Sequence, residues 1–323
     1  MNKKGFLLIL CGGMIALFML SFSSCSAKNP PEPVKPKTEE AQDDKSSPKH
    51  MLAEDNPERQ NNKNENFGNI QESGVTTQVP WENDENFKKA QQQNGTFEMM
   101  AAFRTVLKDP LPGEEYNVHL GARYLAGTVI KPEEVFSQNQ RIGPYTEARG
   151  FQIGPTYSGA DLITTVGGGV CKIASTLYNA AVLSDLQTVE RHNHTMPVPY
   201  VPYGQDATVS YGTNDLRFKN TTPSPVLIWA QGVDNVLYIG FYGNKKPGKV
   251  EWHHETQNLQ KAPVVYRDNP SMAPDTEKKV AEGMDGATVK SWVVIEKPDG
   301  TKVEKQLGKS YYKPFPHIIE RRK

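Results

Sequence analysis

The hydrophobic pattern divides the chain into four parts. Residues 5–22 form an unbroken run of apolar and small residues behind a pair of lysines. Residues 26–95 hold few apolar residues, whereas residues 96–245 hold periodic apolar segments of the kind that build a core. The last part, residues 262–323, carries short apolar segments separated by glycines. We therefore expect a leader, a spacer, one main domain and a small C-terminal module.

The strongest helical pattern follows a run of three glycines. Glycine disfavours a helix, so we expect the helix to begin at or just before Cys171 and to continue to Leu183. A thiol in the first helical turn lies beside unpaired N–H groups and the positive end of the helix dipole, which favour the nucleophilic thiolate. The alternative is a small buried cysteine behind a tight turn. The apolar residues that repeat at helical spacing are Ile173, Ala174, Leu177, Ala180, Ala181 and Val182.

The glycine run suggests a place for a substrate. Gly167, Gly168 and Gly169 carry no side chain, so a substrate backbone is able to approach the sulfur closely there. We therefore count these three glycines as candidate substrate-binding positions.

The remaining pattern predicts helices before strands. Helices are expected over 96–107 and 117–125, and a long functional loop without regular structure over 143–159. A boundary is expected over 245–261. This order predicts an α+β fold, in which helices pack on a mainly antiparallel sheet, with a small all-β module at the C-terminus. Extended segments are expected over 188–194, 206–211, 215–220, 226–230 and 236–242.

The N-terminus has the parts of an export signal. Lysines precede the apolar run, and Phe22-Ser23-Ser24-Cys25 ends it. This ending resembles a bacterial lipobox, in which the cysteine is lipidated, although Phe22 departs from the usual aliphatic residue. We expect a signal peptide over 1–25 and lipidation at Cys25. The alternative is an uncleaved membrane anchor, because the run is about long enough to span a bilayer.

Both readings of the N-terminus place the body of the protein on the extracytoplasmic face of the cell membrane. Residues 26–95, rich in proline, lysine, glutamate, asparagine and glutamine, then predict a disordered spacer that gives the domain reach.

Composition narrows the candidate chemistry. Lysine plus arginine and aspartate plus glutamate both number 37, and no basic patch is visible, so no nucleic-acid partner is expected. The three cysteines are Cys11, Cys25 and Cys171, of which the mature body would hold only Cys171. A single free thiol in an exported protein is unusual and marks it as a candidate nucleophile.

Two histidines and an aspartate follow the cysteine. His192 and His194 are two residues apart, so on a strand they would face the same side, and either is a candidate base for Cys171. We favour His194, with Asp206 as the group that orients it and Asp215 as the second choice. The alternative is a metal site formed by the cysteine and both histidines, but no fourth ligand is evident. We therefore expect no metal and no cofactor.

The motifs from residue 117 to 243 resemble the VanW family of bacterial envelope proteins, which was first associated with vancomycin B-type resistance. This chain has Lys172 and Ala174 where the family commonly has glutamine and serine or threonine. The tail resembles the five-glycine module of wall-associated proteins, through Gly283, Gly286, Gly300 and Tyr312-Lys313-Pro314. The motifs that carry the first resemblance are the segments 131–139, 167–171, 176–181, 190–194, 200–204, 206–209 and 215–220.

The resemblance implies a membrane-tethered protein that acts on peptidoglycan. Some such domains resemble cysteine-dependent L,D-transpeptidases, which implies acyl transfer on stem peptides through a thioester at Cys171. The guanidinium of Arg191 is a candidate to bind a stem carboxylate, with a surface ion pair as the alternative, and Tyr178 is a further candidate substrate-binding residue. The tail module implies binding to wall glycan. Two alternatives stay open, namely a non-catalytic peptidoglycan-binding protein and a scaffolding lipoprotein.

Overall fold

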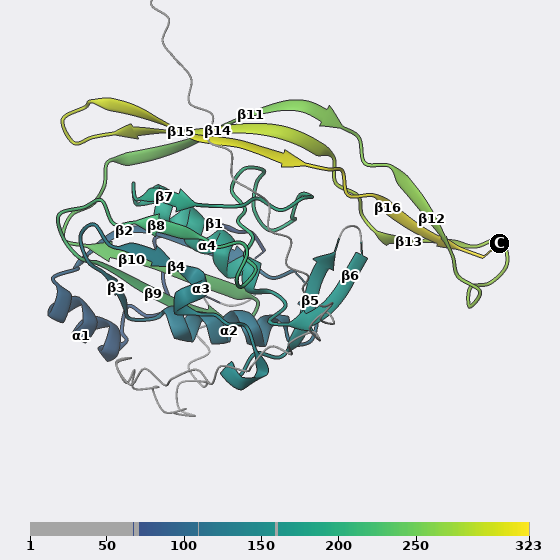
Figure 1. Ribbon diagram of the computed structural model, residues 1–323, viewed down its shortest axis with the longest axis horizontal. Coiled ribbons are helices and arrows are strands. Elements are labelled where there is room, and N and C mark those ends of the chain that lie inside the picture. The colour runs from purple at the N-terminus through teal and green to yellow at the C-terminus, as the bar shows by residue number, and fades with distance from the viewer. Residues whose placement is uncertain (1–66, 68–70, 109, 159–160, 323) are drawn as a thin grey trace, which may run out of the picture. The chain divides into compact units, whose positions relative to one another are not determined.

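The computed structural model describes residues 67, 71–108, 110–158 and 161–322, which all fall within one compact unit, residues 56–323 (Figure 1). The predicted signal peptide, Cys25 and most of the predicted spacer lie outside the described residues. Within the described part of the chain, no helix has both the length and the apolar composition needed to cross a bilayer.

A five-stranded antiparallel sheet forms the centre of the fold. Its order is β1, β2, β10, β9, β3, so β10 lies in the middle. Alternate residues of β9 and β10 enter two different cores, because successive side chains of a strand point to opposite faces. The bounds are β1 Gly74–Val75, β2 Glu98–Val106, β3 Thr128–Ile130, β9 Val226–Val233 and β10 Val236–Gly243.

Helices cover both faces of this sheet. α2 (Glu114–Leu125) and α4 (Val170–Leu183) bury their apolar residues in the larger core on one face. α1 (Glu85–Asn94) contributes Phe87 to the core on the other face. The helices predicted over 117–125 and at Cys171 are therefore present, and the cysteine lies in the first turn of α4.

The helix predicted over 96–107 is instead strand β2. Its glutamate, methionines and alanines favour a helix locally. In the fold the segment pairs with β1 on one side and β10 on the other. Ala102 enters one core and Phe103 the other, so pairing and burial on both faces outweigh the local propensity.

The folded part of the chain begins before the predicted end of the spacer at residue 95. β1 and α1 both lie within that predicted spacer. Trp81 and Phe87 are buried, and the Phe87 ring lies 5.3 Å from Trp229 and 4.7 Å from Tyr242 between centroids. A few large side chains in a polar sequence are thus enough to cover one face of the sheet. Because the segment has a low hydrophobic content, the sequence placed the start of the folded domain too late in the chain.

Smaller elements surround α4. A three-stranded antiparallel sheet has the order β4, β8, β7, and the hairpin β5–β6 precedes the glycine run. The loop predicted over 143–159 therefore contains regular structure, because β5 finds a partner in β6. The bounds are β4 Val135–Ser137, α3 Gln138–Arg141, the 3-10 helix Glu147–Arg149, β5 Ile153–Ser158, β6 Asp161–Val166, β7 Gln187–Glu190 and β8 Arg217–Lys219.

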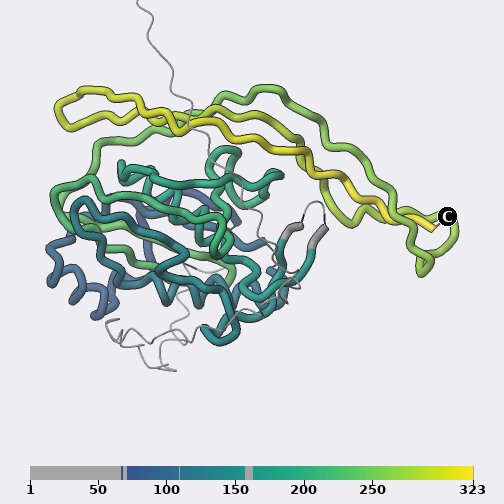
Figure 2. Tube along the Cα trace, viewed as in Figure 1, coloured from purple at the N-terminus to yellow at the C-terminus, as the bar shows by residue number. Residues whose placement is uncertain are grey.

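The C-terminal region is all-β, as predicted, but it begins earlier than predicted. The expected boundary over 245–261 contains β11, which pairs along its length with β14 (Figure 2). One sheet has the order β11, β14, β15, and a second has the order β12, β16, β13, in which β12 and β16 are parallel. The bounds are β11 Lys249–Gln260, β12 Val264–Asp268, β13 Glu277–Ala281, β14 Gly286–Glu296, β15 Lys302–Tyr312 and β16 His317–Arg321.

Candidate active site

Cys171 lies in the first turn of α4, a half-buried free thiol. Gly169 caps this helix with φ 103°, a left-handed conformation that other residues rarely adopt. The Cys171 Sγ atom lies 3.4 Å from the Thr208 hydroxyl oxygen and 3.7 Å from the Val209 carbonyl oxygen. The segment at residues 208–209 thus forms one wall beside the sulfur.

The other two glycines are explained by packing within the protein. A Cβ atom on Gly168 would lie 2.2 Å from backbone atoms of Gly154 in β5. A Cβ atom on Gly167 would lie 2.6 Å from the Cβ of Tyr145. The spaces that side chains would occupy are therefore filled by the protein itself, and a role of these glycines in binding substrate stays a prediction.

His194 completes a Cys-His-Asp arrangement with Cys171 and Asp206. The His194 Nδ1 atom lies 2.6 Å from Asp206 Oδ2. Because a carboxylate only accepts hydrogen bonds, Nδ1 carries the proton in this bond. His194 also acts on Cys171, because its ring is close enough to lower the pKa of the thiol. The three residues favoured by sequence are brought together.

Asp206 is the anchor of this arrangement. Its side chain is only 1% exposed. Oδ2 accepts from the His194 backbone N–H at 2.7 Å as well as from the ring, while Oδ1 accepts from Arg191 Nη2 at 3.0 Å and from the Tyr312 hydroxyl at 2.5 Å. Four donors on one buried carboxylate leave it little freedom to rotate.

Electrostatics favour a thiolate next to an imidazolium. Burial raises the pKa of Cys171, but the hydrogen bond and charge of His194 outweigh burial and lower this pKa to about 7. Burial lowers the pKa of His194, but the bonds to Asp206 and Cys171 outweigh it and raise this pKa to about 9. Burial also acts against the Asp206 carboxylate, yet His194 and Arg191 keep its pKa below the ordinary value.

His192 and Asp215 are directed elsewhere. The His192 side chain is 43% exposed, and its Nε2 lies 3.1 Å from a carboxylate oxygen of Glu190. β7 ends at Glu190, so the two histidines do not share the regular strand that we predicted. Asp215 accepts hydrogen bonds from the Ser137 hydroxyl and from the Asn139 backbone N–H, at the start of α3. Neither residue belongs to the arrangement around Cys171.

Arg191 contacts Asp206 directly, and Tyr178 packs against Arg191. Arg191 Nε donates to the Asp206 carbonyl at 2.7 Å, and the guanidinium lies over the Tyr178 ring at 5.0 Å. Tyr178 is buried beneath it and contacts Trp252 edge-on at 5.5 Å. These intramolecular contacts account for both side chains, and the binding of substrate by Arg191 and Tyr178 stays a prediction.

One residue that holds the candidate site together was not identified from sequence. Ser175 Oγ accepts from the Ala207 N–H, and its one proton lies within reach of the Cys171 carbonyl at 3.0 Å and the Ala207 carbonyl at 3.1 Å, which joins α4 to the segment that carries Asp206 and Thr208. A serine four residues after the cysteine is unremarkable as a motif. The contacts of Ser175 with residues 171 and 207 become evident only in the folded structure.

Lys172 does not act on the thiol as a free charge. Its ammonium pairs with Glu114 and lies 4.9 Å from the centre of the Tyr200 ring. The departure from the family pattern at this position is therefore accommodated by a local ion pair.

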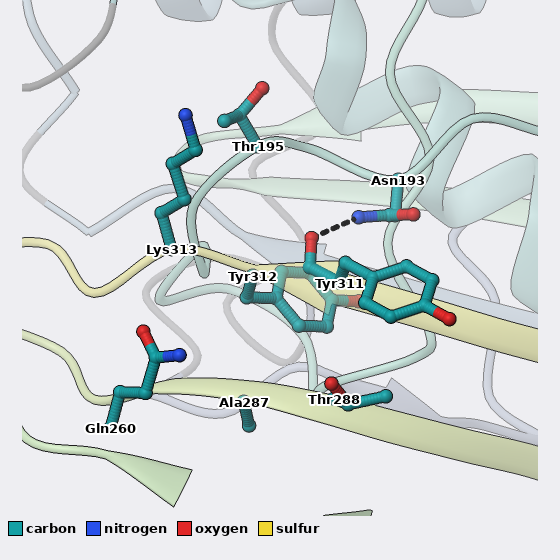
Figure 3. Close-up of a pocket in the computed structure, with 8 residues that line it drawn as sticks. All are labelled: Asn193, Thr195, Gln260, Ala287, Thr288, Tyr311, Tyr312 and Lys313. Atoms are coloured by element: carbon teal, nitrogen blue, oxygen red, sulfur yellow. Dashed lines mark hydrogen bonds between the residues drawn. The ribbon is translucent and has the colours of Figure 1, made fainter. Parts of the chain in front are cut away.

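The described residues contain no group of three or more histidine, cysteine, aspartate or glutamate side chains arranged to hold a metal ion. A pocket of about 390 Å³ lies where residues 193 and 195, on either side of His194, meet the β-rich C-terminal region (Figure 3). Tyr311, Tyr312 and Lys313 line it from the end of β15 and just beyond.

Comparisons with known proteins agree with the two-part organisation. Residues 113–242 match the family described as VanW like protein, and residues 250–321 match the G5 domain. The chain is 37% identical over 147 residues to the uncharacterized protein YoaR of Bacillus subtilis (strain 168), a match that covers 46% of this chain and 48% of YoaR.

A second relative is the vancomycin B-type resistance protein VanW of Enterococcus faecalis (strain ATCC 700802 / V583), 29% identical over 165 residues. That match covers 47% of this chain and 60% of the relative, so the chain spans about half the length of the curated relatives it matches. The chain therefore carries a VanW-like domain over residues 113–242, which holds Cys171, His194 and Asp206, followed by a G5 domain over residues 250–321.

Proposed function

We propose that this chain is a cell-wall-associated protein that performs cysteine-dependent acyl transfer on peptidoglycan stem peptides. The observation that carries the proposal is the placement of His194, whose ring lies 2.6 Å from Asp206 Oδ2 and lowers the pKa of the Cys171 thiol, while the thiol itself is held beside the Thr208 hydroxyl. The VanW-like and G5 matches support the cell wall as the setting. One matched relative is named as a vancomycin B-type resistance protein.

The geometry supports a two-step reaction. The Cys171 thiolate attacks the carbonyl carbon of a stem-peptide amide, and the resulting tetrahedral intermediate collapses as the imidazolium of His194 protonates the leaving amine. This breaks the C–N bond and leaves a thioester. An acceptor amine then attacks the thioester and loses a proton to His194, the C–S bond breaks, and the thiolate returns. Water in place of the amine would give hydrolysis.

The test is to incubate the full chain with purified muropeptides and to identify products by mass spectrometry. We expect new cross-linked products, or trimmed stems where water is the acceptor, and no product from Cys171→Ala. His194→Ala should reduce turnover by at least about 10²-fold, because it removes the base.

His192→Ala is the matched control, two residues away and bonded to Glu190. Equal product from native protein and Cys171→Ala would reject the mechanism. Binding of muropeptides by both, without product from either, would support the alternative of a non-catalytic peptidoglycan-binding protein, to which the G5 match lends weight.

The proposal includes an extracytoplasmic location at the cell membrane. It rests on the sequence of residues 1–25, and lipidation at Cys25 stays a prediction.

A further inference from the structure

Strand β15 of the G5 domain contacts the segment that carries the proposed base and its orienting carboxylate. Arg191 Nη1 donates to Ser310 Oγ at 2.7 Å, and the Lys313 N–H donates to the Thr195 carbonyl at 2.8 Å. Asn193 Nδ2 donates to the Tyr311 carbonyl at 2.9 Å (Figure 3). These bonds connect the residues on both sides of His194 to the end of β15 and to the residue after it.

Tyr312 makes the most direct of these contacts. Its hydroxyl accepts from the Gly204 N–H at 2.8 Å, so its single proton is available to donate to Asp206 Oδ1 at 2.5 Å. Burial and the charge of Asp206 raise the pKa of Tyr312, which keeps the hydroxyl a donor. The other donor to Oδ1 is Arg191, which is itself held by Ser310. One donor to Oδ1 thus belongs to β15, and the other is hydrogen-bonded to it.

We propose that Tyr312 is a positioning residue for the Cys171–His194–Asp206 site, so that the site is complete only with the G5 domain in place. By holding Oδ1, Tyr312 and the Ser310-bound Arg191 turn Oδ2 toward His194, and the oriented carboxylate keeps the imidazole against the thiol. The role in catalysis rests on the proposed function, whereas the effect on the thiol does not require turnover.

Strand geometry provides a matched pair of variants. Successive residues of β15 point to opposite sides, so Ser310 and Tyr312 are buried while Tyr311 is 64% exposed. Tyr312→Phe removes one hydroxyl that contacts Asp206, and Tyr311→Phe removes one hydroxyl from the other side of the same strand.

The test measures the rate at which iodoacetamide alkylates Cys171 in the full chain across pH, below the thermal unfolding temperature of each variant. We expect Tyr312→Phe to move the alkylation midpoint to higher pH and to slow alkylation at pH 7 on the order of tenfold, with Tyr311→Phe like the native chain. In the muropeptide assay, kcat should fall with KM unchanged. If Tyr312→Phe does not fold, Ser310→Ala, which removes the hydroxyl that Arg191 Nη1 contacts, should change the alkylation profile in the same direction.

A native-like alkylation profile for the folded Tyr312→Phe chain would overturn the proposal, as would an equal shift in Tyr311→Phe. The same criterion applies to Ser310→Ala where that variant takes its place. Absence of muropeptide products from the native chain would reject the proposed function alone, because the alkylation profile still decides the role of Tyr312.

Discussion

Asp206 shows how a single buried residue selects between two candidate histidines. His192 and His194 both follow strand β7, yet only His194 has both its backbone N–H and its ring on the Asp206 carboxylate. His192 turns instead to Glu190. Which histidine lies near the thiol thus depends on its contact with a buried carboxylate, rather than on the spacing of the histidines.

The first residue-scale prediction concerns pH. The pKa of Cys171 is lowered to about 7 and that of His194 is raised to about 9, so the thiolate–imidazolium pair should predominate between these values. Below about 7 the thiol is protonated, and above about 9 the imidazolium loses its proton. We therefore expect a bell-shaped dependence of kcat/KM on pH with limbs near these values, measured with muropeptide substrate. A single rising limb that continues beyond pH 9 would contradict the role of His194 as the acid.

A second residue-scale prediction separates the two carboxylates. Asp206→Asn removes the charge that stabilises the imidazolium, so the pKa of His194 should fall and that of Cys171 should rise toward its ordinary value of 9. Alkylation of the thiol at pH 7 should slow accordingly. Glu190→Gln, which removes the charge beside His192, is the control and should leave alkylation unchanged. An equal effect of both variants would mean that the net charge of the region, rather than the Asp206 contact, sets the thiol reactivity.

At the scale of elements, α4 presents the thiol because the hairpin β5–β6 packs against its glycine run. Gly168 lies against Gly154 of β5, and Gly169 starts the helix with a left-handed φ. The hairpin thus fixes the point at which α4 begins, and with it the position of Cys171.

The corresponding prediction is that Gly168→Ala destabilises the fold by more than about 2 kcal/mol, because the new Cβ would meet backbone atoms that are not free to move aside. Chemical denaturation of the variant and the native chain measures this. Gly74→Ala is the control, since Gly74 also has an ordinary φ but has no atom within 4 Å of the added Cβ. Equal stability of both variants would show that the hairpin shifts easily away from α4.

The local sequence pattern predicts those elements in which the spacing of apolar residues itself determines which side chains are buried. The α4 helix and its cysteine followed from glycines and helical spacing, and strands β9 and β10 from their apolar runs. β2 was mistaken for a helix, because its alanines and methionines gain their burial from partners that are distant in the sequence. No motif in the sequence indicates that Tyr312 contacts Asp206, because 106 residues separate them.

At the scale of the whole described unit, the VanW-like and G5 domains share hydrophobic packing. Val293 and Ile295 of β14 belong to the same buried cluster as Ile173 and Leu177 of α4, and Trp252 of β11 packs against this cluster. By contrast, every residue of β12 is exposed. The G5 domain therefore has one part that is continuous with the core around Cys171 and one part that is not.

This difference in burial predicts which strands of the G5 domain unfold together with α4. Amide hydrogens of β14 should exchange as slowly as those of α4, because burial in a common core makes the two elements unfold together. Amide hydrogens of β12 should exchange faster, since its side chains bury little apolar surface. Hydrogen–deuterium exchange of the full chain, followed by mass spectrometry of peptides, resolves the three elements. Exchange of β14 as fast as β12 would mean that the G5 domain opens independently of α4, and Tyr312 would then leave Asp206 in the open state.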